Sequence, residues 1–350
     1  MNKKLKILFC AEDFGSFEQN LYLIRTLNKK KLLDKNKSVF ICNNLFKNKI
    51  EKKLIYQNLF IKNIDQKNYQ VIKNLIKLNK IDLVIAGLSE RYQSLDYRII
   101  KIANEEKINS LVIQDFWGNI GNFDKKNYPK YLLVADRKAK KLTKKKINSK
   151  IIISGLPKYL KKESLFNFRK NKKKTLLIIG QPEYIPGINF YYKFLKKKRI
   201  LNFHNIYYLP HPVEKKFKKF YHKKNIKIIK RENLNKVLNK NLTLINCFST
   251  MSYDILFSAT FSKEIISCKI IFLTFRKKIL SFIKKKVGSE NLPLVDQKNI
   301  FQLSNIKNSD IEINKLFEKK FFKNKFIKKY FLKNHKENFF LKTFYKLLRN

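Results

Sequence analysis

Short apolar runs alternate with helical periodicity along the first 155 residues. Each apolar run is about strand length, and apolar positions three or four residues apart mark the helices between them. Strands are expected at Lys6–Ala11, Ser38–Asn43, Ile81–Gly87, Ser110–Asp115, Tyr131–Asp136 and Ile151–Gly155, with helices at Glu18–Leu27, Tyr69–Leu78 and Asp96–Glu106. Strands that alternate with helices favour a parallel sheet covered on both faces.

The same alternation resumes in the second half of the chain. Strands are expected at Thr175–Gly180, Asn205–Leu209, Leu242–Cys247 and Lys269–Thr274. Between the halves, residues 156–174 contain Pro157 and a basic run, which indicates a linker. The pattern predicts an α/β protein with two Rossmann-like domains, 1–155 and 175–313, facing a central cleft.

The last segment, residues 314–350, mixes Phe, Leu and Tyr with lysines and predicts a helical tail. Such a tail could pack its apolar stripe against the domains and leave the lysines in water. It could also lie on an anionic membrane surface. We favour packing, and the second alternative stays open.

The charge balance is extreme, with 79 Lys and Arg against 26 Asp and Glu and a formal net charge of +53. A polyanionic partner, either nucleic acid or an anionic membrane, would explain it. Compositional bias also explains it, because Lys, Asn, Ile and Phe are abundant while Gly and Pro are scarce, and lysines occur along the whole chain. No signature of a nucleic-acid-binding module is present, so no specific nucleic-acid partner is expected.

The four cysteines, Cys10, Cys42, Cys247 and Cys268, lack metal-ligand spacing. Most of them lie in apolar runs, which predicts free buried thiols and a reducing compartment. The apolar run at the start is too short for a signal peptide, and no stretch has the length of a membrane span. A cytoplasmic location is expected, either free or peripheral at the inner face of the membrane.

Two loops in the second half are candidates for phosphate binding. One follows a strand and contains His211, whose backbone the next residue, Pro212, helps to fix. The other is a hydroxyl-rich turn that opens a helix, where free N–H groups and the helix dipole suit an anion. The candidate donor-binding residues are Gly180, Gln181, His211, Pro212, Glu214, Ser249, Thr250 and Ser252.

Carboxylates follow two strands of the first half, namely Asp115 after one and Glu12 with Asp13 after another. Each can act as a general base or simply cap the next turn. We favour Asp115 as the base. No D-x-D triplet is present, so no metal site is predicted. The histidines His204 and His335 are expected at the surface, and Trp117 in the core.

This arrangement resembles glycosyltransferases of the GT-B architecture. The His211-Pro212 pair followed by the Ser249-Thr250 turn is similar to paired motifs of bacterial sialyltransferases, polysialyltransferases and CDP-glycerol glycerophosphotransferases. The stretch Ile113–Asn119 is similar to a segment of surface-carbohydrate transferases. The likeness covers roughly residues 1–280. In the sialyltransferase families an acidic pair directly precedes Gly, whereas here Phe14 separates Asp13 from Gly15.

The resemblance implies that residues 1–155 hold the acceptor and residues 175–313 hold the nucleotide of the donor. The donor would be a CMP-, CDP- or UDP-linked sugar, used without a separate cofactor or metal. The acceptor would be a surface glycan or a lipid-linked molecule. Two alternatives remain: an enzyme like UDP-N-acetylglucosamine 2-epimerase, and a basic non-enzymatic protein that binds nucleic acid or a membrane surface.

Overall fold

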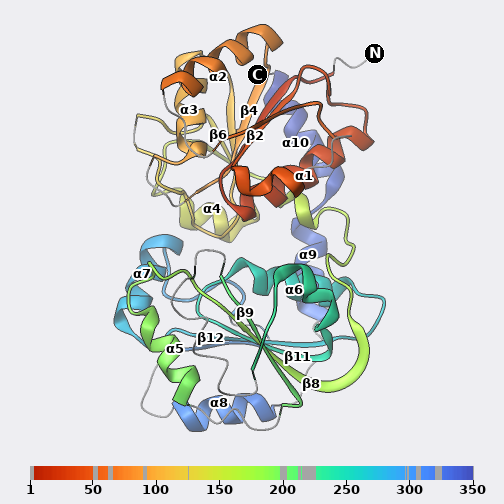
Figure 1. The fold of residues 1–350 in the computed structure, drawn as a ribbon, viewed down its shortest axis with the longest axis vertical. Coiled ribbons are helices and arrows are strands. Elements are labelled where there is room, and N and C mark those ends of the chain that lie inside the picture. The colour runs from red at the N-terminus through yellow and green to blue at the C-terminus, as the bar shows by residue number, and fades with distance from the viewer. Residues whose placement is uncertain are drawn as a thin grey trace. The chain divides into compact units, whose positions relative to one another are not determined.

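The protein folds into two compact α/β units (Figure 1). The computed structural model describes residues 4–49, 54–61, 66–89, 93–124, 126–197, 203–211, 214, 226–295, 297, 299–304, 309–319 and 325–349. Unit 1 comprises Met1–Lys161 together with Lys333–Asn350, and unit 2 comprises Lys162–Leu332. Each unit is built on its own parallel sheet, so the predicted class of two Rossmann-like α/β halves is confirmed.

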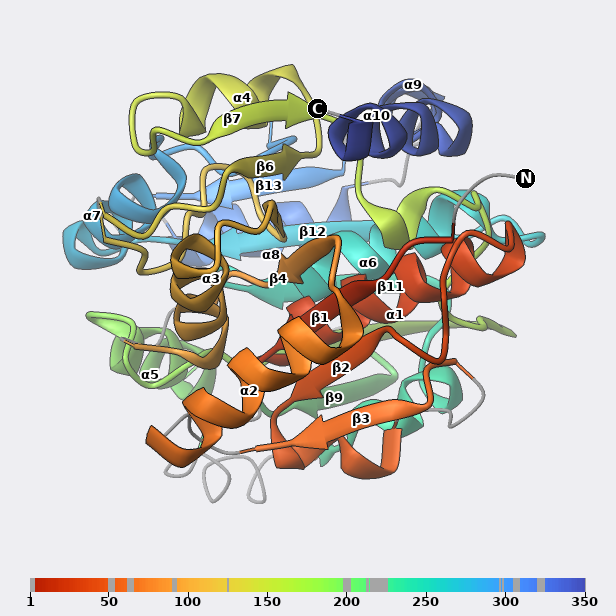
Figure 2. The same ribbon diagram turned by 90° about the horizontal axis from the view of Figure 1, so that it is seen from above.

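The sheet of unit 1 has seven parallel strands in the order β3-β2-β1-β4-β5-β6-β7, and Figure 2 shows most of them following one another across the unit. The strands are β1 (Ile7–Ala11), β2 (Val39–Cys42), β3 (Gln57–Phe60), β4 (Leu83–Ala86), β5 (Ser110–Ile113), β6 (Tyr131–Val134) and β7 (Lys150–Ile153). The order reverses direction between β1 and β4. In open α/β sheets, ligands bind outside the carboxyl ends of the strands at such a reversal.

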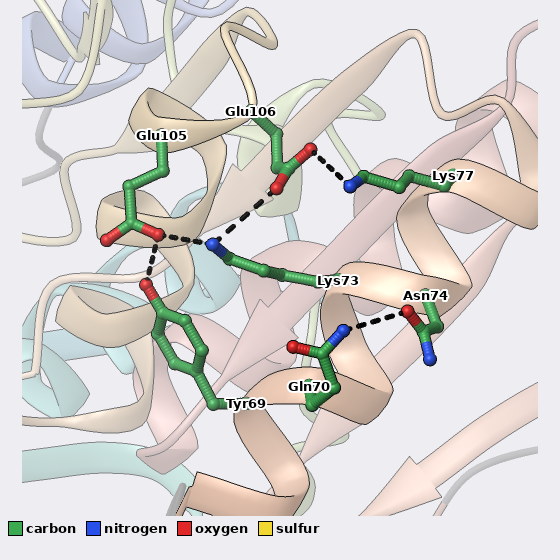
Figure 3. A network of polar contacts seen from close by, with 7 residues as sticks. All are labelled: Tyr69, Gln70, Lys73, Asn74, Lys77, Glu105 and Glu106. Carbon is green, nitrogen blue, oxygen red and sulfur yellow. Dashed lines mark hydrogen bonds and ion pairs between the residues drawn. The ribbon is translucent and has the colours of Figure 1, made fainter.

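The helices of unit 1 are α1 (Phe14–Lys29), α2 (Gln66–Asn79), α3 (Leu95–Glu105), α4 (Arg137–Thr143) and α10 (Glu337–Arg349), with short 3-10 turns η1 (Asn44–Lys49) and η2 (Pro157–Tyr159). Side chains join α2 to the end of α3 (Figure 3): Lys73 Nζ lies 2.7 Å from Glu105 Oε2 and 3.6 Å from Glu106 Oε1. Exposed pairs of this kind contribute at most about 1 kcal/mol each.

The sheet of unit 2 repeats this topology with six parallel strands in the order β10-β9-β8-β11-β12-β13. The strands are β8 (Arg169–Ile179), β9 (Asn205–Leu209), β10 (Lys227–Ile228), β11 (Asn239–Asn246), β12 (Ser267–Leu273) and β13 (Ile300–Leu303). The helices are α5 (Ile188–Lys197), α6 (Thr250–Phe261), α7 (Lys277–Val287), α8 (Ser309–Glu318) and α9 (Lys325–Asn334), with the 3-10 turn η4 (Arg231–Lys236). Here the strand order reverses between β8 and β11, so the same type of crevice is expected at their carboxyl ends.

The predicted linker 156–174 differs from the structure at both ends. Its start contains η2, and its last six residues form the first half of β8, where Arg169 pairs with Asn239. The basic sequence of this half hid the strand, because main-chain pairing with β11 holds it without an apolar pattern. The two units divide between Lys161 and Lys162, inside the predicted segment.

The predicted helical tail is present as α9 and α10. Ile327 and Phe331 of α9 are fully buried, and the Phe331 ring lies 5.0 Å from that of Phe257 in α6. Phe340 and Phe344 of α10 are buried as well, in unit 1. The apolar stripe therefore packs inward, which is the alternative we favoured. Among the described residues, no helix combines the length and apolarity that a membrane crossing requires.

Candidate functional site

The carboxylates that follow β1 are held by neighbouring backbone. Asp13 is the N-cap of α1, and its Oδ1 accepts hydrogen bonds from Ser16 N and Ser16 Oγ, both at 2.9 Å. Glu12 accepts a hydrogen bond from the N–H of Leu95, the first residue of α3. Both acids thus lie where the strand order reverses, each with a fixed partner.

Asp115, which follows β5, lies beside Asp13. A Cβ built on Gly15 would be 3.6 Å from Asp115 Oδ2 and 3.7 Å from Asp13 Oδ1, so the two carboxylates flank the same small space. The other oxygen of Asp115 accepts a hydrogen bond from Asn119 Nδ2 at 3.1 Å. Two acids that the sequence placed on separate loops are therefore brought together by the sheet.

A fourth acid at this edge, Asp96, was not among the predicted site residues. It is fully buried in the first turn of α3, and its oxygens accept hydrogen bonds from Gly87 N (3.0 Å) and Ser89 N (3.2 Å). Burial, together with the nearby charges of Asp13 and Glu12, raises its pKa to about 8. In the sequence, Asp96 looks like an ordinary acid at a helix start. Only the fold shows that its carboxyl group is buried close to Asp13 and Glu12.

At the carboxyl edge of unit 2, Gly180 allows close packing of two loops. A Cβ there would lie 2.5 Å from both Glu214 Oε2 and His211 N. Glu214 is 2% exposed, and its carboxylate accepts hydrogen bonds from His211 N (3.1 Å) and from the Tyr208 hydroxyl. Glu214 therefore holds the backbone of His211. The predicted neighbour Pro212 lies outside the described residues.

The side chain of His211 is half-buried. Burial lowers its pKa to about 4, so the imidazole is neutral near pH 7. A neutral imidazole still carries one N–H that can donate to an anion.

Gln181 connects the ends of β8 and β11. It is fully buried, and its Oε1 accepts a hydrogen bond from Phe248 N at 2.9 Å while its Nε2 donates to Gly180 O at 2.9 Å. The loop that Phe248 begins leads directly to Ser249, the N-cap of α6, whose Oγ accepts a hydrogen bond from Met251 N at 3.3 Å. By binding Phe248 N, Gln181 thus holds the loop that leads into α6.

The hydroxyl cluster of this turn has two environments. Ser249 and Thr250 are half-buried at the helix start, whereas Ser252 is fully buried and its Oγ has no hydrogen-bond partner among the described residues. The amide of Asn246, at the end of β11, is likewise buried without a partner. Ser249 and Thr250 are therefore better placed for a ligand than Ser252.

The predictions for Trp117 and His335 have different outcomes. Trp117 is 3% exposed and its Nε1 donates to Asp136 Oδ2 at 2.9 Å, as expected of a core residue. His335 was expected at the surface, and this was wrong: it is fully buried, and its Nδ1 accepts a hydrogen bond from Leu156 N at 2.9 Å. Gly155, at φ 81°, leaves room for it.

Among the described residues, no group of three or more His, Cys, Asp or Glu side chains is arranged to hold a metal ion.

No protein-family model and no curated protein sequence matches this chain. Solved structures do match along nearly its whole length. The spinosyn forosaminyltransferase SpnP has a TM-score of 0.62 at 8% identity, covering 99% of this chain and 100% of that one. The glycotransferase of kitacinnamycin has a TM-score of 0.60 at 9% identity, with coverage of 99% and 100%. A glycosyltransferase from Rickettsia africae has a TM-score of 0.57 at 12% identity, with coverage of 99% and 98%. At these identities the likeness shows the fold, and the chain has the two-sheet GT-B fold.

Proposed function

We propose that this protein is a metal-independent glycosyltransferase that moves a sugar from a nucleotide-activated donor to a hydroxyl of a surface-glycan or lipid-linked acceptor. The observation that carries the proposal is the pairing of Asp13 and Asp115 at the strand-order reversal of a GT-B sheet. A transfer to a hydroxyl needs a group that removes its proton, and an ionised carboxylate suits this role.

The donor phosphate is assigned to unit 2. The N-terminus of α6 at Ser249 and Thr250 presents main-chain N–H groups, of which Met251 N donates to Ser249 Oγ, and the positive end of the helix dipole. His211, half-buried and neutral, adds one more donor from the end of β9. Developing negative charge on the leaving phosphate would be stabilised by these fixed dipoles.

The base is assigned to unit 1, with Asp115 first and Asp13 second. Both flank the space above Gly15. Asp115 ranks first because Asp13 Oδ1 already accepts hydrogen bonds from Ser16 N and Oγ, and Glu12 accepts one from the backbone of α3. Asp115 has one oxygen bonded to Asn119 and the other directed to that space. A carboxylate held in one orientation is a more effective base than a mobile one.

The donor is proposed to carry CMP, CDP or UDP, in line with the motif resemblance of His211 and the Ser249 turn. The net charge of +53 would favour a peripheral position on an anionic membrane, where a lipid-linked acceptor would be found. The cytoplasm and the inner membrane face are accordingly the proposed locations.

The test is a thermal-shift screen with CMP, CDP, UDP and GDP, followed by assays of donor consumption. A nucleotide that binds the folded state raises the unfolding temperature by mass action. Product formed from donor alone would indicate an epimerase, whereas transfer to an added acceptor supports the proposal. Steep, salt-dependent binding to DNA or vesicles with no nucleotide effect would indicate a non-enzymatic binder.

A further inference from the structure

Asp96 fixes the backbone at the end of a neighbouring strand. It is 0% exposed, and it accepts hydrogen bonds from Gly87 N at 3.0 Å and Ser89 N at 3.2 Å. Both donors lie just after β4, on the carboxyl side of the strand-order reversal. One side chain on α3 thus determines where this loop runs.

The loop in turn supports the first turn of α1. A Cβ on Gly87 would lie 2.1 Å from Ser16 Cβ and 2.5 Å from Ser16 Oγ, so Ser16 packs directly on the backbone that Asp96 holds. Ser16 N and Oγ both donate to Asp13 Oδ1 at 2.9 Å. A continuous series of contacts therefore runs from Asp96 through Gly87 and Ser16 to Asp13.

We propose that Asp96 is a positioning residue for the pair of candidate bases, fixing Asp13 beside Asp115 through Gly87 and Ser16. This inference rests on the proposed glycosyltransferase function. Asp96 is too deeply buried to touch an acceptor, so it acts only through the residues that it holds. The side chain at position 96 must therefore accept hydrogen bonds without disturbing the charge of the base.

The titratable groups that face Asp96 are Cys10 from β1 and the acids Glu12 and Asp13 from the segment before α1. Burial and the nearby Asp96 carboxyl raise the pKa of the Cys10 thiol. With its pKa raised to about 8, Asp96 is mostly a neutral acid near pH 7. It then adds no charge beside Asp13 and Glu12.

Ionisation of Asp96 above pH 8 places a buried negative charge next to two others. The folded state binds a proton that the unfolded state, with an ordinary Asp pKa of 3.8, has lost. This stabilisation is complete below the unfolded pKa and is lost as pH rises through the folded pKa of about 8. The position of Asp13 relative to Asp115 should become less fixed as the pH approaches the folded pKa of Asp96, about 8.

The experiment compares Asp96→Asn, which keeps the shape and neutrality, with Asp96→Leu, which removes the acceptor atoms. The matched control is Asp82→Asn, just before β4 at the other end of the strand, where the Asp82 carboxylate accepts Lys6 N at 2.9 Å. Transfer kcat and donor KM are measured across the pH range from neutral to alkaline.

Asp96→Leu should lower kcat by about a hundredfold, the scale of a misplaced catalytic group, with donor KM nearly constant. Asp96→Asn keeps one acceptor oxygen and can therefore hold only one of the two backbone N–H groups. It should restore part of this kcat and lose the decline of kcat near pH 8. Asp82→Asn should retain that decline. Equal kcat in Asp96→Leu and wild type, or an unchanged alkaline decline in Asp96→Asn, overturns the proposal.

A second readout needs no substrate. ¹³C NMR of aspartate-labelled protein should show one carboxyl titrating near pH 8 that is absent in Asp96→Asn, and an Asp13 signal displaced in Asp96→Leu alone. If no carboxyl titrates there, or the Asp13 signal stays in place in Asp96→Leu, the positioning role is wrong. If both NMR results hold while no nucleotide sugar is consumed, the proposed function fails and the placement of Asp13 by Asp96 stands.

Discussion

The two sheets share a topology but differ in the chemistry of their carboxyl edges. In both, the strand order reverses at the first strand, at β1 and β4 in unit 1 and at β8 and β11 in unit 2. The edge of unit 1 gathers four carboxyl groups, whereas at the edge of unit 2 Glu214 is engaged by tyrosine and backbone donors and has one acidic neighbour, Glu183, in the loop after β8. The backbone thus sets the place of each candidate site, and the side chains set what it can bind.

The glycine that follows the first strand of each sheet shows the same contrast. At Gly15 an added Cβ would lie 3.6 Å from Asp115 Oδ2 and 3.7 Å from Asp13 Oδ1, so a methyl group fits in ordinary van der Waals contact with the carboxylates. At Gly180 it would meet Glu214 Oε2 and His211 N at 2.5 Å, because two loops pack on that backbone. The position of an added Cβ is therefore accessible at Gly15 in unit 1, whereas two loops already occupy it at Gly180 in unit 2.

The largest effect is expected from removing the base of unit 1. Asp115→Asn keeps the side-chain shape but removes the charge, and general-base catalysis contributes about 10²–10⁴-fold to rate. Transfer should fall by that factor while donor affinity, measured by calorimetry, stays near wild type. Asn is also a good N-cap, so Asp13→Asn preserves α1 and shows whether Asp13 shares the role. Normal turnover in both variants would remove the carboxylates of unit 1 from the mechanism.

A smaller loss, in binding rather than turnover, is expected in unit 2. His211→Ala removes one hydrogen bond to a charged group, worth about 1.5–3 kcal/mol, or roughly tenfold to a hundredfold in nucleotide affinity. Exposed His204, which precedes β9, provides the control in His204→Ala. Wild-type affinity in His211→Ala would show that the donor phosphate does not bind at this edge.

His211 also makes the stability of the folded state depend on pH. Its pKa is lowered from 6.5 to about 4, so the unfolded state binds a proton that the folded state does not. The stabilisation is present above pH 6.5 and is lost as pH falls through 4. Urea unfolding between these values should show a steeper acid loss in wild type than in His211→Ala.

The glycine contrast is tested by paired substitutions. Gly180→Ala forces Glu214 and the His211 loop apart, and overpacking of this kind costs about 1–3 kcal/mol. Gly15→Ala lies in the first turn of α1, where a methyl group fits at van der Waals distance, and should be neutral or slightly stabilising, since Ala is the better helix former. Thermal unfolding of the two variants measures the difference, and equal stabilities would refute the packing contrast.

The smallest effect is expected at the start of α6. Ser249→Ala removes the N-cap hydrogen bond to Met251 N, which costs about 0.5–2 kcal/mol of stability. Ser249→Asp keeps a cap but adds negative charge where a phosphate is proposed to bind. Nucleotide titration should therefore show weaker binding in the Asp variant than in the Ala variant, and the reverse order would argue against a phosphate at this turn.

The sequence by itself determined the alternation of strands and helices, and hence the two α/β units and the places where strands end. Strand ends are local features, because an apolar run stops where its backbone leaves the core. For that reason Glu12, Asp13, Asp115, His211 and Ser249 could be singled out from the sequence, and all of them lie at the carboxyl edges of the two sheets.

Only the tertiary structure decided which polar residues are buried together. Asp96 and His335 have unremarkable sequence surroundings, yet both are 0% exposed and bonded to another segment. The basic first half of β8 likewise became a strand through its pairing with β11. Burial of a single polar residue depends on partners far along the chain, and a local pattern carries no information about those partners.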